Sequence, residues 1–108
     1  MELYIKDRFY IPQMLPQQGK FTEFNLKRGI IAKVAITEKD KKEYSITEHP
    51  EDGKIEWDSK KDFESPLVVE FSKEEIDYLK KSCESLVETA YPDDFWLTVE
   101  KIYDAANA

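Results

Sequence analysis

The residues best suited to chemistry in this chain are its only histidine, His49, and its only cysteine, Cys83. A histidine that acts as a general base needs a positioned partner and a cleft, but His49 precedes Pro50 in a segment that predicts an exposed turn. A nucleophilic cysteine needs a stabilised thiolate, whereas Cys83 falls on the apolar stripe of a predicted helix, beside Leu79 and Leu86. We therefore expect no catalytic residue and no enzyme activity.

A cluster of carboxylates surrounds the histidine, and carboxylate oxygens are the ligands that calcium prefers. The cluster consists of Glu48, Glu51, Asp52, Glu56 and Asp58. It lacks the regular spacing of a calcium-binding loop, and Lys54 stands within it. A hydrolase would need two of these acids at a defined separation in a cleft, which makes a small hydrolase the weakest reading. We expect a solvated face, with no metal site and no cofactor.

One short region is locally basic and also carries aromatic side chains, a combination that can contact nucleic acid. It comprises Lys20, Phe21, Phe24, Lys27, Arg28 and Lys33. No nucleic-acid-binding signature accompanies these residues, and the rest of the chain is acidic, which repels phosphate. Nucleic acid is therefore not the expected partner.

Three large aromatic residues, Trp57, Phe95 and Trp96, are the candidate partner-binding residues, because exposed aromatics often anchor protein interfaces. Phe95 and Trp96 are adjacent on a predicted helix, so their side chains point in different directions. Any of the three that is buried joins the core instead. The expected partner is another protein or a second copy of the chain.

Size and composition predict one folded domain covering residues 1–108. Hydrophobic residues make up 41% of the chain and charged residues 36%. The net charge of −7 is uneven: six basic and three acidic side chains lie in residues 1–36 (+3), six and ten in 37–64 (−4), and four and ten in 65–108 (−6). The N-terminus carries charges where a signal peptide is apolar, no run has the length of a membrane span, and a lone cysteine suits a reducing compartment. We expect a cytoplasmic protein without membrane contact.

The N-terminal third predicts two helices around a corner. Apolar residues over 3–15 favour a helix that ends or kinks near Pro12, although the alternation of apolar residues there also allows a strand. The segment 15–19 (LPQQG) predicts a tight turn, because Pro16 disfavours helix for the residue before it and Gly19 accepts unusual backbone angles. Thr22 is then the expected N-cap of a helix reaching Val34.

The remainder predicts a small sheet followed by two helices. Thr37 and Asp40 resemble a capping box, 44–57 reads as a hairpin with a turn at 49–53, 59–66 as a polar connector, and 67–71 (LVVEF) as a third strand. Ser72 with Glu75 caps a helix whose apolar face comprises Ile76, Leu79, Cys83, Leu86, Val87 and Ala90. Asp93 or Asp94 is expected to cap a final helix.

The predicted fold class is thus α+β. Two N-terminal helices precede a small antiparallel sheet, made of the hairpin and the third strand. Two C-terminal helices then pack on that sheet.

Four stretches together carry a family resemblance: LPQQG at 15–19, ITEKDKKEY at 36–44, GKIEWD at 53–58 and FSKEEIDYLKK at 71–81. With them the chain resembles small, uncharacterised phage- and prophage-encoded proteins of unknown function. The resemblance implies a mobile-element origin in a bacterial cytoplasm and transfers no activity. We expect a non-enzymatic protein-binding accessory module. Its partner is another protein or, in a homodimer, a second copy of the chain. The alternative is an acidic inhibitor or nucleic-acid mimic acting on a host DNA-binding protein.

Overall fold

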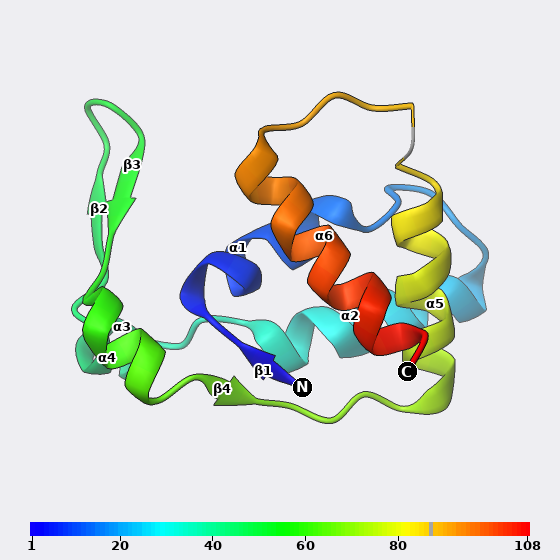
Figure 1. Ribbon diagram of the computed structural model, residues 1–108, viewed down its shortest axis with the longest axis horizontal. Coiled ribbons are helices and arrows are strands. Elements are labelled where there is room, and N and C mark those ends of the chain that lie inside the picture. Colours follow the sequence, from blue (N-terminus) through cyan, green and yellow to red (C-terminus); the bar gives the residue numbers. More distant parts are fainter. Residues whose placement is uncertain (87) are drawn as a thin grey trace.

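The computed structural model describes residues 1–86 and 88–108 and is of the α+β class, with short antiparallel strands beside a helical body (Figure 1). Val87, which the sequence pattern places on the apolar face of the helix predicted from Ser72, lies outside the described residues. The helices are α1 (Ile5–Met14), α2 (Phe21–Val34), α3 (Glu38–Glu43), α4 (Ser59–Glu64), α5 (Lys73–Glu84) and α6 (Asp93–Ala106). The strands are β1 (Glu2–Leu3), β2 (Thr47–His49), β3 (Lys54–Glu56) and β4 (Leu67–Val68).

The core lies between the two N-terminal and the two C-terminal helices. α5 packs against α6 and α2, and α1 packs against α6 and α2. The side chains that are at most 1% exposed in this core include Leu3, Ile11, Met14, Ile30, Val34, Leu79, Phe95 and Ile102. The prediction that the C-terminal helices pack on the sheet is wrong, because the strands are too short to present a buried face and the helices bury their apolar stripes against one another.

The predicted three-stranded sheet is also wrong, because the strands form two separate pairs. β2 pairs with β3 in the expected hairpin, with Glu48 opposite Ile55, whereas β4 pairs with β1, with Leu3 opposite Leu67. The ammonium group of Met1 donates to the Val69 carbonyl (2.9 Å), which holds the third strand at the N-terminus. The β2–β3 hairpin consequently projects from the helical body (Figure 1).

Residues 5–14 form the helix that the sequence favoured for 3–15, whereas Leu3 belongs to β1, and the helix neither ends nor begins anew at Pro12. α1 continues through Pro12 to Met14. Leu15 is extended, as expected for a residue before Pro16, so the predicted corner between the first two helices is confirmed. The part assigned to Gly19 is wrong, because Gly19 does not have a positive φ.

Two of the predicted caps are confirmed and two are wrong. The Ser72 hydroxyl accepts the N–H of Glu75, and Thr37 accepts that of Asp40, so both capping boxes form. α2 begins one residue before Thr22, because the Glu23 carboxylate reaches back to the N–H of Lys20 (3.0 Å).

The remaining differences lie at the starts of α6 and α4. Pro92 is the N-cap of α6, and Asp93 and Asp94 occupy its first turn, where the helix dipole favours negative charge. The predicted polar connector contains α4, which forms because the Asp58 carboxylate accepts the N–H of Lys61 (3.1 Å).

Candidate functional site

The surface between α5 and α6 contains a hollow of about 650 Å³, here called the acidic groove. Its lining residues are Cys83, Glu84, Trp96, Val99, Glu100 and Tyr103. The four that belong to α6 are spaced so that they share one face of a helix. The groove therefore follows from the helical register of α6 beside the end of α5.

The groove combines an apolar floor with a charged rim. Cys83 and Val99 are buried, Trp96 and Tyr103 are half-buried, and Glu84 and Glu100 are exposed. The Tyr103 hydroxyl donates to the Glu84 carboxylate (3.1 Å), and this hydrogen bond raises the pKa of Tyr103. Aromatic faces beside carboxylates suit a cation that has an apolar stem, such as a lysine or arginine side chain.

The adjacent aromatics Phe95 and Trp96 point in different directions, as the sequence predicts. Phe95 is 1% exposed and belongs to the core, where it stacks on Tyr91 (ring centroids 4.1 Å apart) and meets Tyr10 edge-on. Trp96 meets both Tyr91 and Phe95 edge-on, at 5.6 and 6.0 Å, and lines the groove. Only Trp96 of this pair is available to a partner.

Trp57, the third candidate, lies in a different place. It is half-buried against Phe9 (6.2 Å between ring centroids) and lines a hollow of about 370 Å³ between the hairpin and α1. The ion pair between Lys6 and Asp94 (3.1 Å) involves two other residues of that hollow. The structure thus does not bring Trp57 and Trp96 into one site.

Cys83 lies in the interior, as the sequence predicts. It is 6% exposed, and its Sγ lies 3.8 Å from the Val99 carbonyl oxygen. Burial raises its pKa to about 11, so the thiol is protonated at neutral pH. A nucleophilic role needs the thiolate, and this environment disfavours it.

His49 and the surrounding carboxylates remain at the surface. His49 Nε2 lies 3.5 Å from a carboxylate oxygen of Glu56, across the hairpin, and Glu48, Glu51 and Asp52 are exposed. Within residues 1–86 and 88–108, no three histidine, cysteine or acidic side chains are grouped so that they could hold a metal ion.

Sequence reasoning missed the buried polar groups that join the helices. Asp7 is 3% exposed and accepts hydrogen bonds from the Thr98 hydroxyl, the Lys101 ammonium group (both 2.7 Å) and the N–H of Tyr4 (3.0 Å). Only the last partner is near in the sequence: the spacing of Tyr4 and Asp7 is that of a helix start. Because its partners satisfy this carboxylate, Asp7 has a structural role.

Arg8 and Asp62 are two further buried charges that the sequence did not reveal. Arg8 donates to the carbonyls of Val34 (3.0 Å) and Ala35 (2.6 Å) and to the Asp40 carboxylate (2.7 Å). The Asp62 carboxylate accepts the N–H of Ile5, at 3.0 and 3.2 Å. Burial raises the pKa of Asp62, a shift that the hydrogen bond opposes. Both residues tie the start of α1 to distant segments.

The predicted basic region does not form one surface. Lys27 is half-buried and donates to the Pro16 carbonyl (2.8 Å). Lys33 pairs with Glu75 (2.5 Å) and so belongs to the contact between α2 and α5. Lys20, Phe21, Phe24 and Arg28 form an exposed group at the start of α2, here called the basic-aromatic patch. Phe21 is 76% exposed and Phe24 49%, and the Arg28 guanidinium lies 5.6 Å from the centre of the Phe24 ring.

Comparisons with known proteins found no match from which a function of the site could be inferred. No protein-family model matches the chain, and neither the curated proteins nor the solved structures contain a match. Among the described residues, the helices are all too short or too polar to cross a membrane.

Proposed function

We propose that this chain is a non-enzymatic protein-binding accessory module whose acidic groove holds a basic segment of a partner protein. The observation that supports this most is the composition of the groove: the Trp96 and Tyr103 side chains line it together with the carboxylates of Glu84 and Glu100. A volume of about 650 Å³ is of the size that binds small molecules or a few side chains.

Two physical effects favour a cationic occupant. The faces of the aromatic rings carry negative electrostatic potential and attract a lysine or arginine head group, by about 0.5–1 kcal/mol at an exposed site. The carboxylates add an attraction of similar size that salt screens. The apolar floor at Cys83 and Val99 adds affinity for the stem of the side chain or for a neighbouring apolar residue.

The cellular location in which the protein acts is also part of the proposal. The resemblance to small phage and prophage proteins supports a role in a bacterial cytoplasm, in which the module binds a partner protein and catalyses no reaction. The neutral thiol of Cys83 and the fully paired carboxylate of Asp7 are consistent with such a role.

The test uses the intrinsic fluorescence of Trp96. In Trp57→Phe this residue is the only tryptophan, and the probe is the peptide acetyl-Lys-Phe-Arg-Phe-Lys-amide. We expect a saturable change in Trp96 emission, and about tenfold weaker binding in Glu84→Gln/Glu100→Gln, because each carboxylate contributes up to about 1 kcal/mol.

Two controls make this test specific. Glu48→Gln/Glu56→Gln removes the same charge from the hairpin and is expected to leave the affinity unchanged. The matched peptide acetyl-Glu-Phe-Glu-Phe-Glu-amide is expected not to bind. Equal binding of both peptides, or equal effects of the two double variants, would contradict the proposal.

A second candidate function is an acidic inhibitor or nucleic-acid mimic. The exposed carboxylates of the projecting hairpin favour it, since they are free to meet a basic protein. A mimic needs a continuous row of charge, however, and the hairpin and α5 lie at opposite ends of the longest axis (Figure 1). If the mimic reading holds, the protein displaces labelled duplex DNA from a basic nucleoid protein, and Glu48→Gln/Glu51→Gln/Glu56→Gln loses that effect.

A further inference from the structure

The chain carries both halves of a complementary contact. The acidic groove presents two aromatic rings and two carboxylates, and the basic-aromatic patch presents the phenyl rings of Phe21 and Phe24 with the cations Lys20 and Arg28. Apolar side chains as exposed as Phe21, at 76%, are common singly but often mark an interaction site when paired and flanked by charge.

The two surfaces are similar in scale. Phe21 and Phe24 are three residues apart on α2, so their Cβ atoms lie about 5–6 Å apart on one helix face. Trp96 and Tyr103 are seven residues apart on α6, so they are about two turns, or about 10 Å, apart along the groove. The two aromatic pairs are therefore spaced on the same scale, within a factor of about two.

The charges of the patch and of the groove are complementary. Lys20 precedes Phe21 and Arg28 follows Phe24 by one turn, so the cations flank the two rings. Glu84 and Glu100 are exposed and stand on opposite helices of the groove. The residues 1–36 carry a charge of +3 and the residues 65–108 a charge of −6, counted from the sequence. Such opposite patches steer association and are weakened by salt.

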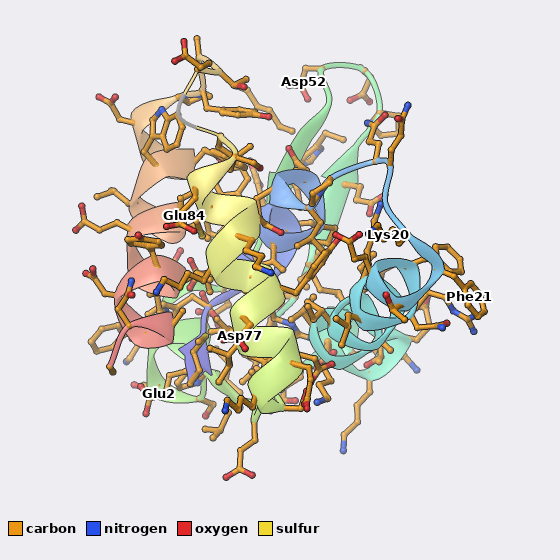
Figure 2. The ribbon with its side chains drawn as sticks, turned by 90° about the vertical axis from the view of Figure 1, so that its right-hand side faces the viewer. Glu2, Lys20, Phe21, Asp52, Asp77 and Glu84 are labelled. Carbon is orange, nitrogen blue, oxygen red and sulfur yellow. The ribbon has the colours of Figure 1, made fainter. Side chains whose placement is uncertain are left out.

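A contact of the patch with the groove of the same molecule is prevented by their positions. Figure 2 shows Phe21 at the outer edge of the molecule on one side of α5, and Glu84 on the other side, toward α6. A second molecule can bring its patch to this groove. The two surfaces differ, so the contact is heterologous, and repeated copies form a ring or an open chain.

We propose that the partner of the acidic groove is a second copy of this chain, which inserts Phe21 and Phe24 of its basic-aromatic patch. This rests on the proposed function of the groove and names its occupant. Each molecule in the assembly then inserts its patch into the groove of one neighbour and receives the patch of another neighbour in its own groove. The contact is weak and reversible in our account, because exposed ion pairs contribute only about 0–1 kcal/mol each.

Sedimentation velocity of the full chain over a range of concentrations tests the proposal, with two variants. The patch variant is Phe21→Ser/Phe24→Ser, and the groove variant is Glu84→Lys/Glu100→Lys; all four positions are exposed, so both variants are expected to retain the fold. The matched control, Glu48→Lys/Glu56→Lys, makes the same charge change on the hairpin.

We expect the wild type to associate, with a dissociation constant that rises about tenfold or more from low to high salt. Each variant alone is expected to be monomeric, and the control to associate like the wild type. A mixture of the two variants is expected to form a 1:1 dimer and nothing larger, because one intact patch meets one intact groove.

Three results would overturn the proposal: a monomeric wild type at high concentration and low salt, association that both variants retain, or a mixture that stays monomeric. Binding of single-stranded DNA to the patch with no self-association would assign the patch to nucleic acid instead. The proposed function has a separate readout, since Trp96 can still respond to the basic peptide when the chain is monomeric. Failure of both measurements would remove both proposals.

Discussion

The buried carboxylates of the helical body and the exposed carboxylates of the projecting hairpin differ in their surroundings. In the body, Asp7 and Glu75 are at most 6% exposed, and each accepts hydrogen bonds from a lysine and from a helix start. In the hairpin, Glu48 and Glu51 face solvent. Acidic composition alone therefore does not locate function. Between these extremes, the groove carboxylates are exposed yet held beside aromatic rings, and this position makes them candidates for binding.

The largest expected difference concerns apolar residues of the two regions. Leu79 is 1% exposed in the core, and Leu79→Ala is expected to lower the free energy of unfolding by about 2–5 kcal/mol, since it leaves a cavity. Ile55 on the hairpin is 36% exposed, and Ile55→Ala is expected to cost at most about 0.5 kcal/mol. Urea denaturation measures both values, and similar costs would contradict the division into body and hairpin.

The next effect compares a buried with an exposed carboxylate. Asp7→Ala is expected to cost about 3 kcal/mol, because it removes the acceptor of Thr98, Lys101 and the N–H of Tyr4. Glu51→Ala is the matched control and is expected to change stability by at most about 0.5 kcal/mol. An Asp7 variant as stable as the control would show that this network does not hold α1 to α6.

A smaller effect is expected at the hairpin turn. Gly53 has a φ of +71°, in the left-handed region that glycine adopts readily. Gly53→Ala is expected to cost about 1 kcal/mol, and Gly53→Asn less, because asparagine tolerates this conformation. Hydrogen exchange should show faster exchange in β2 and β3 alone. Faster exchange throughout α5 would mean that the hairpin supports the body.

The pH dependence of stability separates the half-buried Asp40 from the buried Asp62. Burial raises the pKa of Asp40, but the hydrogen bonds from Arg8 and Thr37 outweigh it, so its pKa is lowered. Stability from Asp40 is therefore present above about pH 4 and is lost as the pH falls through the folded pKa. Asp40→Asn should consequently be less sensitive to pH below about 4 than the wild type.

The pKa of Asp62 shifts in the opposite direction, because burial raises it. Its ionisation opposes folding as the pH rises above about 4, the ordinary pKa of an aspartate. The asparagine in Asp62→Asn still accepts the N–H of Ile5 and stays neutral. The free energy of unfolding of this variant, relative to that of the wild type, should thus grow as the pH rises above about 4. Denaturation at a series of pH values measures both differences, and parallel profiles would contradict both assignments.

Several local features were predicted correctly because their causes are local, although the predicted caps at Thr22 and at Asp93 or Asp94 were wrong. The capping boxes at Ser72 and Thr37 and the hairpin turn at Gly53 each depend on a few neighbouring residues. The register of the third strand could not be predicted, because its partner, Glu2–Leu3, is more than sixty residues away. α4 was missed because a polar segment of its length has little helical signal apart from the cap at Asp58.

The candidate site was predictable only in part. Trp96 was identified from its residue type, but its separation from Phe95 and its neighbours Glu84 and Tyr103 depend on how α5 packs against α6. Thr98 and Lys101, two of the partners of Asp7, lie more than ninety positions away in the chain, so no local pattern reveals them.

The most direct test of the account is an NMR titration of uniformly ¹⁵N-labelled protein with the peptide acetyl-Lys-Phe-Arg-Phe-Lys-amide. If the acidic groove is the binding surface, the amide and indole signals that shift belong to the end of α5 and to the Trp96–Tyr103 face of α6, and the hairpin signals stay in place. Shifts confined to residues 47–56 of the hairpin, or no shifts at all, would contradict it.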